Sequence, residues 1–350
     1  LKVLDLCAAP GGKSTHILSL LNDESVLVSN EIVSNRATIL KENLIKWGNA
    51  NVIVTNANPE QFSVHDEMFD VIVIDAPCSG EGLFRKDEGA KVEWSEQHAH
   101  ACSIRQQKIL ESVLPSLKKG GILIYSTCTF NPDENENNIQ NWVNEFPLEC
   151  LSLTLNSEWG VEEINLNNAT GYQCWPHKVK GEGFFISVLI KTDFISSGVT
   201  ANQHVHRKKE FQNSNRISLP ELKSAFNWFS NRNEIFLMND SVEQLASQLN
   251  CKILSSGTFA GTLLRNEFIP SHDLAMCTSA ANFNYPKIEL TKPEALKYLS
   301  KENFNLHITQ KGWRIVTHQN IPLGWIKNIG NRFNNYYPAK WRIRMQLPTA

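Results

Sequence analysis

The sequence predicts an α/β protein with a doubly wound, parallel sheet, followed by a small α+β domain and a β-rich C-terminal domain. Over residues 1–190, hydrophobic runs of strand length alternate with longer segments of helical periodicity. The strands are almost continuously apolar, which is typical of parallel strands buried on both faces. From residue 303 onward, aromatic residues and cations alternate in runs of hairpin length. Ligands of doubly wound sheets bind beyond the carboxyl ends of the strands, so the residues there receive most weight.

Length and composition describe an ordinary globular protein of two or three domains. The chain has 350 residues, of which 41% are hydrophobic and 20% charged. No apolar run approaches the roughly 18 residues that span a bilayer, and no signal peptide is recognisable. Because the chain opens with Leu inside a core strand, we expect a further segment upstream. The eight cysteines form no C-x-x-C pair and no zinc-like cluster. We therefore expect a cytoplasmic monomer without metal.

The first predicted strand and helix enclose a turn of small residues. A strand over residues 3–6 and a helix over residues 12–21 flank this turn. In a strand–turn–helix unit, the N–H groups that open the helix can bind a polar or anionic ligand group. An ordinary glycine-containing βα turn is the alternative. The string Ala-Ala-Pro-Gly-Gly-Lys is more specific than glycines alone, and it does not match the dinucleotide pattern Gly-x-Gly-x-x-Gly.

This string resembles motif I of the RNA cytosine-5 methyltransferases, whose fold is the Rossmann-like sheet of class I methyltransferases. The resemblance implies S-adenosylmethionine as the cofactor. The residues of the turn that would bind it are Cys7, Ala8, Ala9, Pro10, Gly11, Gly12 and Lys13. Without the resemblance, Lys13 would be an ordinary surface lysine.

Polar residues after the second and third predicted strands suit the same cofactor. Glu31 follows the strand over residues 26–30 and lies twenty residues after Gly11, an offset typical of a carboxylate that binds ribose hydroxyls. The alternative for Glu31 is a solvated loop carboxylate. Asn58 follows the strand over residues 51–55, where relatives usually place an aspartate that reads the adenine edge. An asparagine can accept a hydrogen bond there and can also donate one.

Two cysteines follow neighbouring predicted strands. Asp75 ends the strand over residues 71–75 and Cys78 comes soon after it, while Cys128 follows the strand over residues 122–126. An isolated cysteine is usually a small buried hydrophobe, but packing does not explain two at adjacent strand ends. A thiolate that adds to C6 of cytosine makes C5 nucleophilic toward a methyl sulfonium, and a carboxyl group stabilises the adduct at N3. Spacing alone does not tell which cysteine attacks.

The resemblance assigns roles to these three residues. In the RNA family the cysteine of the Thr-Cys string, here Cys128, attacks, and the cysteine of the Pro-Cys string, here Cys78, assists release. Asp75 would serve both catalysis and cofactor binding. In DNA cytosine-5 methyltransferases the Pro-Cys cysteine attacks instead. Because both cysteines are present, the resemblance points to RNA as the substrate.

The remaining elements of the first 190 residues are predicted from periodicity and helix signals. Helices are expected over residues 34–47, 95–117 and 132–146. The string at residues 131–134 is interpreted as an N-cap, a first-turn proline and two acidic residues of the third helix. Residues 80–86 form a glycine-rich loop, favoured as a mobile flap over a plain exposed turn. A last strand over residues 184–190 closes the sheet.

Composition shifts predict four segments. They are a methyltransferase domain at 1–191, a polar linker at 192–218, a small α+β domain at 219–290 and a PUA-like RNA-binding domain at 291–350. His204, His206, Arg207, Lys208 and Lys209 cluster in the linker, without the further ligands of a metal site. A capping box at Thr291 predicts a helix that ends near Leu299. Strands are expected over residues 313–317, 323–327 and 341–345, with a turn at residues 319–320.

The C-terminal segment is basic although the whole chain carries a net charge of −2. No Asp or Glu occurs from residue 303 onward, so the rest of the chain sums to −9. The cations predicted to contact RNA are Lys311, Arg314, Lys327, Arg332, Lys340, Arg342 and Arg344. Interleaved aromatic residues are expected partly in the core and partly stacked on unpaired bases. The string at residues 323–327 resembles the PUA-type tail of the RsmF-type branch of bacterial small-subunit rRNA methyltransferases.

The resemblance therefore implies an S-adenosylmethionine-dependent RNA cytosine-C5 methyltransferase that acts on 16S rRNA or the small ribosomal subunit. Two alternatives remain at this point. One is the same reaction on tRNA, and the other is a non-catalytic ribosome-assembly factor that keeps the fold for RNA binding. The presence of Asp75 and of both cysteines argues against lost catalysis.

Overall fold

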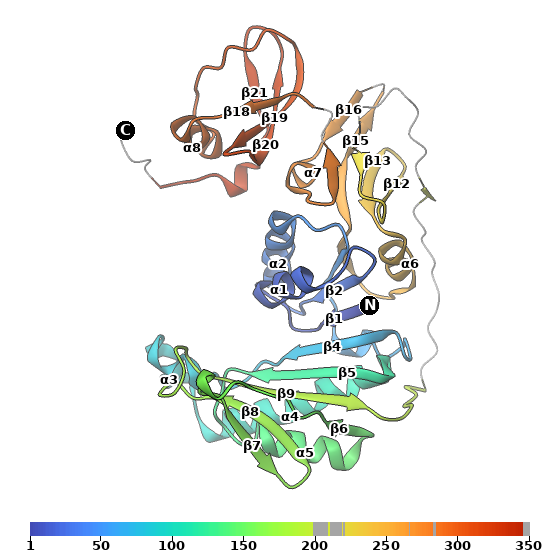
Figure 1. The fold of residues 1–350 in the computed structure, drawn as a ribbon, viewed down its shortest axis with the longest axis vertical. Helices are drawn as coiled ribbons and strands as arrows, with labels where there is room; N and C mark the ends of the chain where they lie inside the picture. Colours follow the sequence, from blue (N-terminus) through green and yellow to red (C-terminus); the bar gives the residue numbers. More distant parts are fainter. Residues whose placement is uncertain (199–208, 211–218, 220, 266, 283–284, 346–350) are drawn as a thin grey trace. The chain divides into compact units, whose positions relative to one another are not determined.

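The computed structural model describes residues 1–198, 209–210, 219, 221–265, 267–282 and 285–345 (Figure 1). The chain divides into two compact units. Unit 1 comprises Leu1–Leu40, Ile53–Val205 and Ser247–Leu254, and unit 2 comprises Lys41–Val52, His206–Ala246 and Ser255–Ala350. Most of the predicted linker, including His204, His206, Arg207 and Lys208, lies outside the described residues. Of the helices in the described ranges, none is long and apolar enough to cross a membrane.

Unit 1 is built on a ten-stranded sheet with the order β14-β3-β2-β1-β4-β5-β9-β8-β7, in which β6 also pairs with β9. The strands are β1 (Lys2–Asp5), β2 (Val26–Asn30), β3 (Val52–Thr55), β4 (Phe69–Asp75), β5 (Leu117–Thr127), β6 (Leu148–Cys150), β7 (Glu162–Leu166), β8 (Ala169–Cys174), β9 (Phe184–Lys191) and β14 (Ile253–Ser256). Neighbours from β2 through β1 and β4 to β5 run parallel. Since β1 lies between β2 and β4, the strand order reverses there, which is where doubly wound sheets bind ligands.

Helices cover this sheet and confirm the predicted alternation. They are α1 (Gly12–Leu20), α2 (Ser34–Trp47), α3 (Glu88–Glu93), α4 (Glu96–Val113) and α5 (Glu136–Glu145). α4 and α5 lie together on one face (Figure 1), and Trp142 of α5 packs edge-on against Tyr125 of β5 at 4.7 Å. Both side chains are fully buried, so they fix α5 over the strand that leads to Cys128.

The sheet is parallel as predicted between β2 and β5, but its far side differs from the prediction. β9 pairs antiparallel with β5, and β8 and β7 continue the antiparallel arrangement. Residues 147–183, which the periodicity left unassigned, supply β6, β7 and β8. These strands are three to six residues long, and β7 alternates between half-buried and exposed positions. Such short, polar strands carry little periodic signal.

Three predicted element bounds are also wrong. α5 begins at Glu136 instead of Pro132, because the Asn131 side chain accepts from the Asp133 N–H (2.9 Å) and closes a turn before the helix. The helix expected to reach residue 117 ends at Val113, two residues before a proline. The strand expected over residues 341–345 is absent, and the 3-10 helix η5 (Ala339–Trp341) precedes that segment.

Unit 2 contains three small sheets and three helices among the described residues. The sheets have the orders β10-β12-β13-β15-β16, β11-β17 and β18-β19-β20-β21. The strands are β10 (Lys209–Glu210), β11 (Glu221–Leu222), β12 (Asn227–Asn231), β13 (Glu234–Met238), β15 (Thr258–Leu264), β16 (Glu267–Pro270), β17 (Ala280–Asn282), β18 (Lys287–Glu289), β19 (Gly312–His318), β20 (Ile321–Asn328) and β21 (Phe333–Asn335). The helices are α6 (Asp240–Gln248), α7 (His272–Met276) and α8 (Lys292–Ser300).

Two local predictions in unit 2 are confirmed. The Thr291 N–H donates to Glu294 Oε2 (2.8 Å) in the capping box that opens α8. Gln319 and Asn320 both have positive φ, 50° and 64°, in the two-residue turn that joins β19 to β20. Positive φ at both central residues is the conformation of a type I′ hairpin turn, for which asparagine is favoured.

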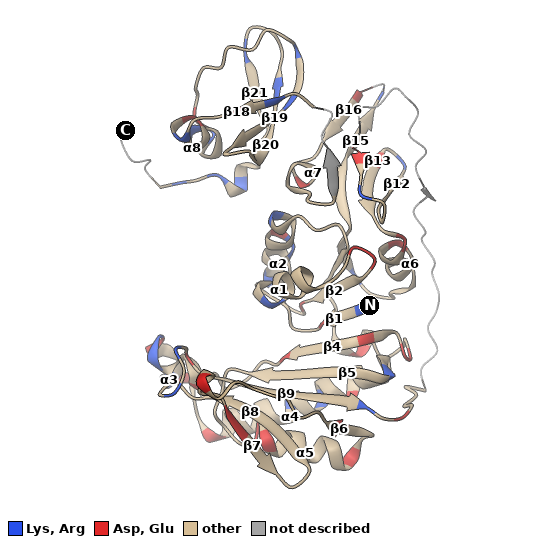
Figure 2. Cartoon of the chain, viewed as in Figure 1, with Lys and Arg blue, Asp and Glu red and all other residues tan. Residues whose placement is uncertain are grey.

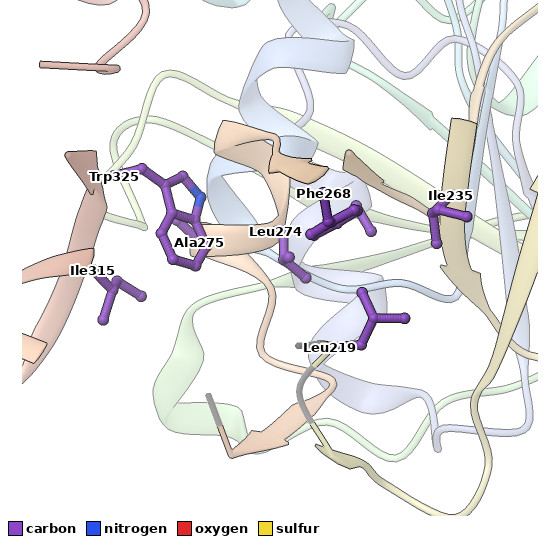
Figure 3. Close-up of a cluster of buried hydrophobic side chains, with 8 residues drawn as sticks. Leu219, Ile235, Phe268, Leu274, Ala275, Ile315 and Trp325 are labelled. Carbon is purple, nitrogen blue, oxygen red and sulfur yellow. The ribbon is translucent and has the colours of Figure 1, made fainter. Parts of the chain in front are cut away.

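A buried apolar cluster holds unit 2 together (Figure 3). Figure 3 shows Trp325 of β20 and Ile315 of β19 beside Leu274 and Ala275 of α7. The indole N–H of Trp325 donates to the Ser271 carbonyl oxygen (2.6 Å), which satisfies the polar end of this fully buried ring. The cluster joins side chains on both sides of the domain boundary predicted at residue 290, and that boundary stays a prediction.

Candidate active site

A cleft of about 1070 Å³ lies at the carboxyl ends of the central strands of unit 1. Ligand pockets for small molecules measure about 300–1,000 Å³, so a cleft of this size has room for a cofactor and part of a substrate. The predicted site residues that line it are Cys7, Ala9, Glu31, Asn58, Asp75, Cys78 and Cys128. The structure thus brings together the residues that follow β1, β2, β4 and β5.

The motif I turn leaves an uncapped helix start at the strand reversal. Gly11 has a φ of 114°, in the left-handed region that favours glycine, and α1 begins at Gly12 without a side-chain cap or an acidic residue in its first turn. A Cβ built on Gly12 would meet no atom within 4 Å. The first N–H groups of a helix have no acceptor inside it, so this end suits an anionic group of a ligand.

A buried carboxyl group that the sequence analysis missed anchors this turn. Asp5 at the end of β1 is fully buried and accepts a hydrogen bond from Ser14 Oγ of α1 (2.6 Å). Ser29 Oγ of β2 donates in turn to Ser14 Oγ (3.1 Å). Within the described part of the chain, no donor reaches Asp5 Oδ1. Burial raises the pKa of Asp5 from 3.8 to about 7, against the opposing effect of the Ser14 hydrogen bond.

Glu31 is connected to the motif I turn through Arg36, another residue that the sequence analysis missed. Arg36 Nη2 of α2 donates to the Ala9 carbonyl oxygen (2.9 Å), and Nη1 lies 3.4 Å from Glu31 Oε2. Glu31 Oε1 accepts from the Val33 N–H (2.9 Å). The Glu31 carboxylate is buried and held by these contacts, yet it lines the cleft. A fixed carboxylate after β2 suits the hydroxyl groups of a ribose.

Two asparagines organise the third strand end. Asn30 Nδ2 donates to the carbonyl oxygens of Leu6 (3.1 Å) and Ala57 (3.0 Å), which ties the ends of β1, β2 and β3 together. The Asn58 N–H donates to Gln61 Oε1 (3.0 Å) in a capping box that opens the 3-10 helix η1 (Pro59–Gln61). Asn58 therefore has a structural role besides the adenine contact that the resemblance implies.

The register of the sheet brings the two cysteines into contact. Asp75 of β4 lies opposite Ser126 of β5 in the parallel pair, so the residues that follow both strands emerge together. The sulfur atoms of Cys78 and Cys128 lie 3.1 Å apart, within hydrogen-bond distance. Neither forms a disulfide.

Asp75 is held beside this pair by two donors. Lys13 Nζ lies 2.7 Å from Asp75 Oδ2, and Ser126 Oγ donates to Oδ1 (2.8 Å). The Lys13 ammonium group also lies over the Phe184 ring, 5.1 Å from its centroid. The motif I lysine thus contacts Asp75 and Phe184 at the edge of the cleft, unlike an ordinary surface lysine.

The contact between the sulfur atoms shifts the pKa values of the two thiols in opposite directions. The hydrogen bond from Cys78 lowers the pKa of Cys128 below the ordinary value of a thiol, although burial and the Asp75 carboxylate oppose this shift. The Lys13 charge contributes in the same direction as the hydrogen bond. The same contact, with burial, raises the pKa of Cys78. Since a thiolate is the reactive form of cysteine, these directions agree with the attacking role that the resemblance implies for Cys128.

A buried polar network that the sequence analysis missed supports the Cys78 segment. The Glu134 carboxylate accepts from the Ser79 N–H (3.0 Å) and from Gln106 Nε2 (2.8 Å), and the same Gln106 nitrogen donates to the Pro77 carbonyl oxygen (3.0 Å). Asn138 of α5 donates to Gln106 Oε1 (2.9 Å). Burial raises the pKa of Glu134. No motif marks Gln106 or Asn138 in the sequence, since polar residues of amphipathic helices usually face solvent.

The loop predicted as a mobile flap contains the 3-10 helix η2 (Glu81–Arg85). The Gly82 N–H donates to the Cys128 carbonyl oxygen (2.8 Å). A Cβ on Gly82 would lie 2.7 Å from that oxygen and 2.9 Å from the Glu182 carbonyl oxygen, so a side chain does not fit. The Glu81 carboxylate accepts from the Phe130 N–H (3.0 Å). These contacts fasten the loop to the strand end that carries Cys128.

The seven cations predicted to bind RNA lie in unit 2 and differ in their ion pairs and in their exposure. Lys327 pairs with Glu267, and Lys340 pairs with Glu42. Arg314 is half-buried. The exposed cations that form no ion pair within the described ranges are Lys311, Arg332, Arg342 and Arg344. Lys327 also lies over the Trp313 ring, 5.3 Å from its centroid, whereas Trp325 belongs to the core.

Comparison with known families agrees with this geometry. Residues 2–190 match the family model of the 16S rRNA methyltransferase RsmB/F, which covers more than half of the chain. The chain belongs to the 16S rRNA methyltransferase RsmB/F family. Residues 285–343 also match the methyltransferase RsmF PUA domain. RsmB/F proteins are S-adenosylmethionine-dependent RNA methyltransferases, so the resemblance, the fold class, the type of enzyme and the cofactor expected from the sequence are confirmed.

Individual relatives agree with the RsmB/F assignment. The ribosomal RNA small subunit methyltransferase F of Escherichia coli O157:H7 is 30% identical over 97% of this chain and 73% of its own length. The protein of the same name from Shewanella piezotolerans is 28% identical over 96% of this chain and 73% of its own. The crystal structure of PH0851 matches with a TM-score of 0.50 and 29% identity. That match covers 54% of this chain and 42% of PH0851, less than half of that protein.

Proposed function

We propose that this chain is an S-adenosylmethionine-dependent RNA cytosine-C5 methyltransferase that acts on 16S rRNA, as a monomer in the cytoplasm. The observation that carries the proposal is the pair of thiols of Cys78 and Cys128, 3.1 Å apart, beside Asp75 in the cleft of unit 1. In a reaction that forms and then breaks a bond between sulfur and cytosine, one thiol would attack and the second would assist release. The relatives named rRNA small subunit methyltransferase F support rRNA as the substrate.

The residues around the cleft fit S-adenosylmethionine. We assign its ribose to Glu31, its adenine to the region of Asn58, and its charged methionine end to the turn from Cys7 to Lys13 and to Asp75. The uncapped start of α1 suits the carboxylate of the cofactor, and the fixed carboxylate of Glu31 suits its hydroxyl groups. When bound, the cofactor supplies an electrophilic methyl group on sulfur.

In the proposed reaction, the Cys128 thiolate forms a bond to C6 of cytosine, and the electrons of the C5–C6 double bond move into the ring and make C5 nucleophilic. C5 would then take the methyl group as the bond between the methyl carbon and the cofactor sulfur breaks, with its electron pair left on sulfur. The ring takes a proton at N3 from solvent, and the Asp75 carboxylate accepts a hydrogen bond from this N3–H and stabilises the adduct. The N3 proton returns to solvent when the cysteine leaves. The proton on C5 then leaves to solvent, the C5–C6 double bond forms again, and the bond between carbon and the Cys128 sulfur breaks. Cys78 assists this last step by donating a hydrogen bond to the departing thiolate, from which it lies 3.1 Å away in the free protein.

Replacing Cys78 by alanine should trap the covalent intermediate. The variant keeps the Cys128 nucleophile but lacks the thiol that assists its release, so a protein–RNA adduct should accumulate. Incubation of Cys78→Ala with 16S rRNA and S-adenosylmethionine, followed by denaturing gel electrophoresis, detects the adduct as a slowly migrating band.

The double variant Cys78→Ala/Cys128→Ala is the matched control and should give no adduct. An adduct in Cys128→Ala alone would reverse the assignment of the two cysteines. Transfer of a tritiated methyl group to tRNA but not to 16S rRNA would refute the proposed substrate. Binding of rRNA without any transfer would instead indicate an assembly factor.

Replacing Glu31 by glutamine should weaken S-adenosylmethionine binding by about 10- to 100-fold, which corresponds to the loss of a hydrogen bond to a charged group. Calorimetric titration of the cofactor measures this effect. Glu24→Gln removes the same charge at an exposed position outside the cleft and should bind like the unmodified chain. Equal affinities of the two variants would show that Glu31 does not contact the ribose.

In unit 2, we propose that the exposed cations contact the RNA backbone. Lys311, Arg332, Arg342 and Arg344 have no carboxylate partner in the described ranges, and they lie in or next to the segment that matches a PUA domain. Cations that are not neutralised within the protein are the ones available to phosphate groups. We keep the four-segment division of the chain as part of this proposal.

A further inference from the structure

We propose that a second, basic pocket of unit 1 binds the phosphate backbone of the RNA strand directly beside the target cytosine. This inference rests on the proposed function, because it assumes an RNA base in the cleft. It concerns residues of the catalytic unit, not the basic C-terminal segment. The pocket would place single-stranded RNA next to Cys128 independently of unit 2.

The pocket has a volume of about 550 Å³ and forms between η2 and the segment that joins β8 to β9. Its charged lining residues are Arg85, Lys86, Lys178, Lys180 and Glu182, and His177 also lines it. Four of these are Lys or Arg and one is acidic, so the pocket carries excess positive charge. Figure 2 shows Lys and Arg gathered at this end of unit 1, near α3.

Two of the four cations are left without an ion pair by the protein. Lys86 lies 3.1 Å from Glu182, and Lys178 lies 2.8 Å from Glu162. Among the described residues, no carboxylate pairs with Arg85 or Lys180, and both side chains are exposed. Arg85 donates to the Pro176 carbonyl oxygen (3.3 Å), which holds its guanidinium group at the pocket wall. A held arginine next to an unpaired lysine suits a phosphate group.

The lining of the pocket adjoins the lining of the cleft. Leu83 lines the cleft and Arg85 lines the basic pocket, and both belong to η2. Two residues span at most about 7 Å of chain, so the two linings adjoin. The Gly82 N–H bonds to the Cys128 carbonyl oxygen, and the Gly82 Cα packs against the Glu182 backbone. η2 therefore fixes the position of the basic pocket relative to Cys128.

A row of aromatic rings runs from the catalytic strand end into the basic pocket. The ring of Phe130, two residues after Cys128, stacks on Trp175 with centroids 5.3 Å apart and an angle of 24°. His177, which lines the pocket and is exposed, lies 6.2 Å from Trp175. Cations beside stacked rings are how proteins bind single-stranded RNA, since the rings accept bases and the cations contact phosphates. This combination favours an RNA strand over a small free anion.

The test uses the whole chain and a short fluorescein-labelled, single-stranded RNA that contains one cytosine. We expect Arg85→Ala/Lys180→Ala to bind this RNA at least about 10-fold more weakly by fluorescence anisotropy. The plot of log affinity against log salt concentration should become less steep by about 1.4, because each phosphate contact to a single strand contributes about 0.7. S-adenosylmethionine affinity should not change.

Controls separate a phosphate contact from a general loss of charge. Lys119→Ala removes a cation at an exposed position outside the pocket. Its RNA affinity should stay within about two-fold of the unmodified chain, and its salt slope should be the same. A methylphosphonate placed next to the target cytosine should weaken binding to the unmodified chain but not to the double variant. Equal losses in both proteins would overturn the inference.

The outcome is independent of whether methyl transfer occurs. If the double variant shows the expected loss of RNA affinity and of salt slope but the unmodified chain transfers no methyl group, the proposed function fails and the pocket stands as an RNA site. If the chain methylates cytosine and the double variant binds RNA normally, the proposed function stands and this inference fails.

Discussion

Replacing Cys128 by alanine should lower the rate of methyl transfer by about 10⁴-fold or more, because the variant lacks the proposed nucleophile. Cys78 does not replace it, since burial favours the neutral form of that thiol. Single-turnover transfer of a tritiated methyl group to 16S rRNA measures the effect. Calorimetric binding of S-adenosylmethionine should be unchanged, because a small alanine leaves the cofactor contacts at Glu31 intact.

Cys150→Ala is the control for this experiment, as it removes a half-buried thiol of the same sheet outside the cleft. It should retain full activity. If Cys128→Ala kept activity within about ten-fold of the unmodified chain while Cys78→Ala lost it, the nucleophile would be Cys78 and the proposed roles of the two cysteines would be exchanged.

Replacing Asp5 by asparagine should make the protein more stable at pH 8 than the unmodified chain. The pKa of Asp5 is raised from 3.8 to about 7 by burial, so the folded state holds a proton that the unfolded state has released. The stabilising contribution of the protonated carboxyl group is complete below pH 4 and is lost as the pH rises through 7. Asparagine stays neutral throughout, and its oxygen can accept from Ser14.

The difference in the free energy of unfolding between Asp5→Asn and the unmodified chain should therefore grow with pH. A shift of about 3 pKa units corresponds to about 4 kcal/mol between pH 4 and pH 8. Urea unfolding curves at several pH values measure this difference. Glu24→Gln at an exposed position should show no such trend. A constant difference across the pH range would mean that Asp5 is ionised in the folded protein.

Much of the fold and the centre of the site could be predicted from local patterns. Apolar runs of strand length located β1 to β5 and β9, because parallel central strands are buried on both faces. The strand-end rule then placed Asp75, Cys78 and Cys128 in one region. The same pattern could not predict strand direction, because an apolar run such as Phe184–Lys191 is equally compatible with a parallel and an antiparallel strand. Only the pairing of this strand with β5 shows that it is antiparallel.

The supporting residues of the site could not be predicted, because their roles depend on partners distant in sequence. Gln106 and Asn138 look like solvent-facing residues of amphipathic helices until the Glu134 carboxylate is found between them and the Cys78 segment. Arg36 carries no motif signal, since its partner Ala9 contributes only a backbone oxygen. Tertiary contacts of this kind appear only when the chain is folded.

The close contact between the two active-site sulfur atoms has a consequence for the redox chemistry of the enzyme. Two thiols 3.1 Å apart need little movement to be joined by oxidation, which removes two electrons and two protons from the pair. The resulting bond would leave neither a nucleophile nor a release group. We therefore expect treatment with an oxidant to abolish methyl transfer and a reducing agent to restore it.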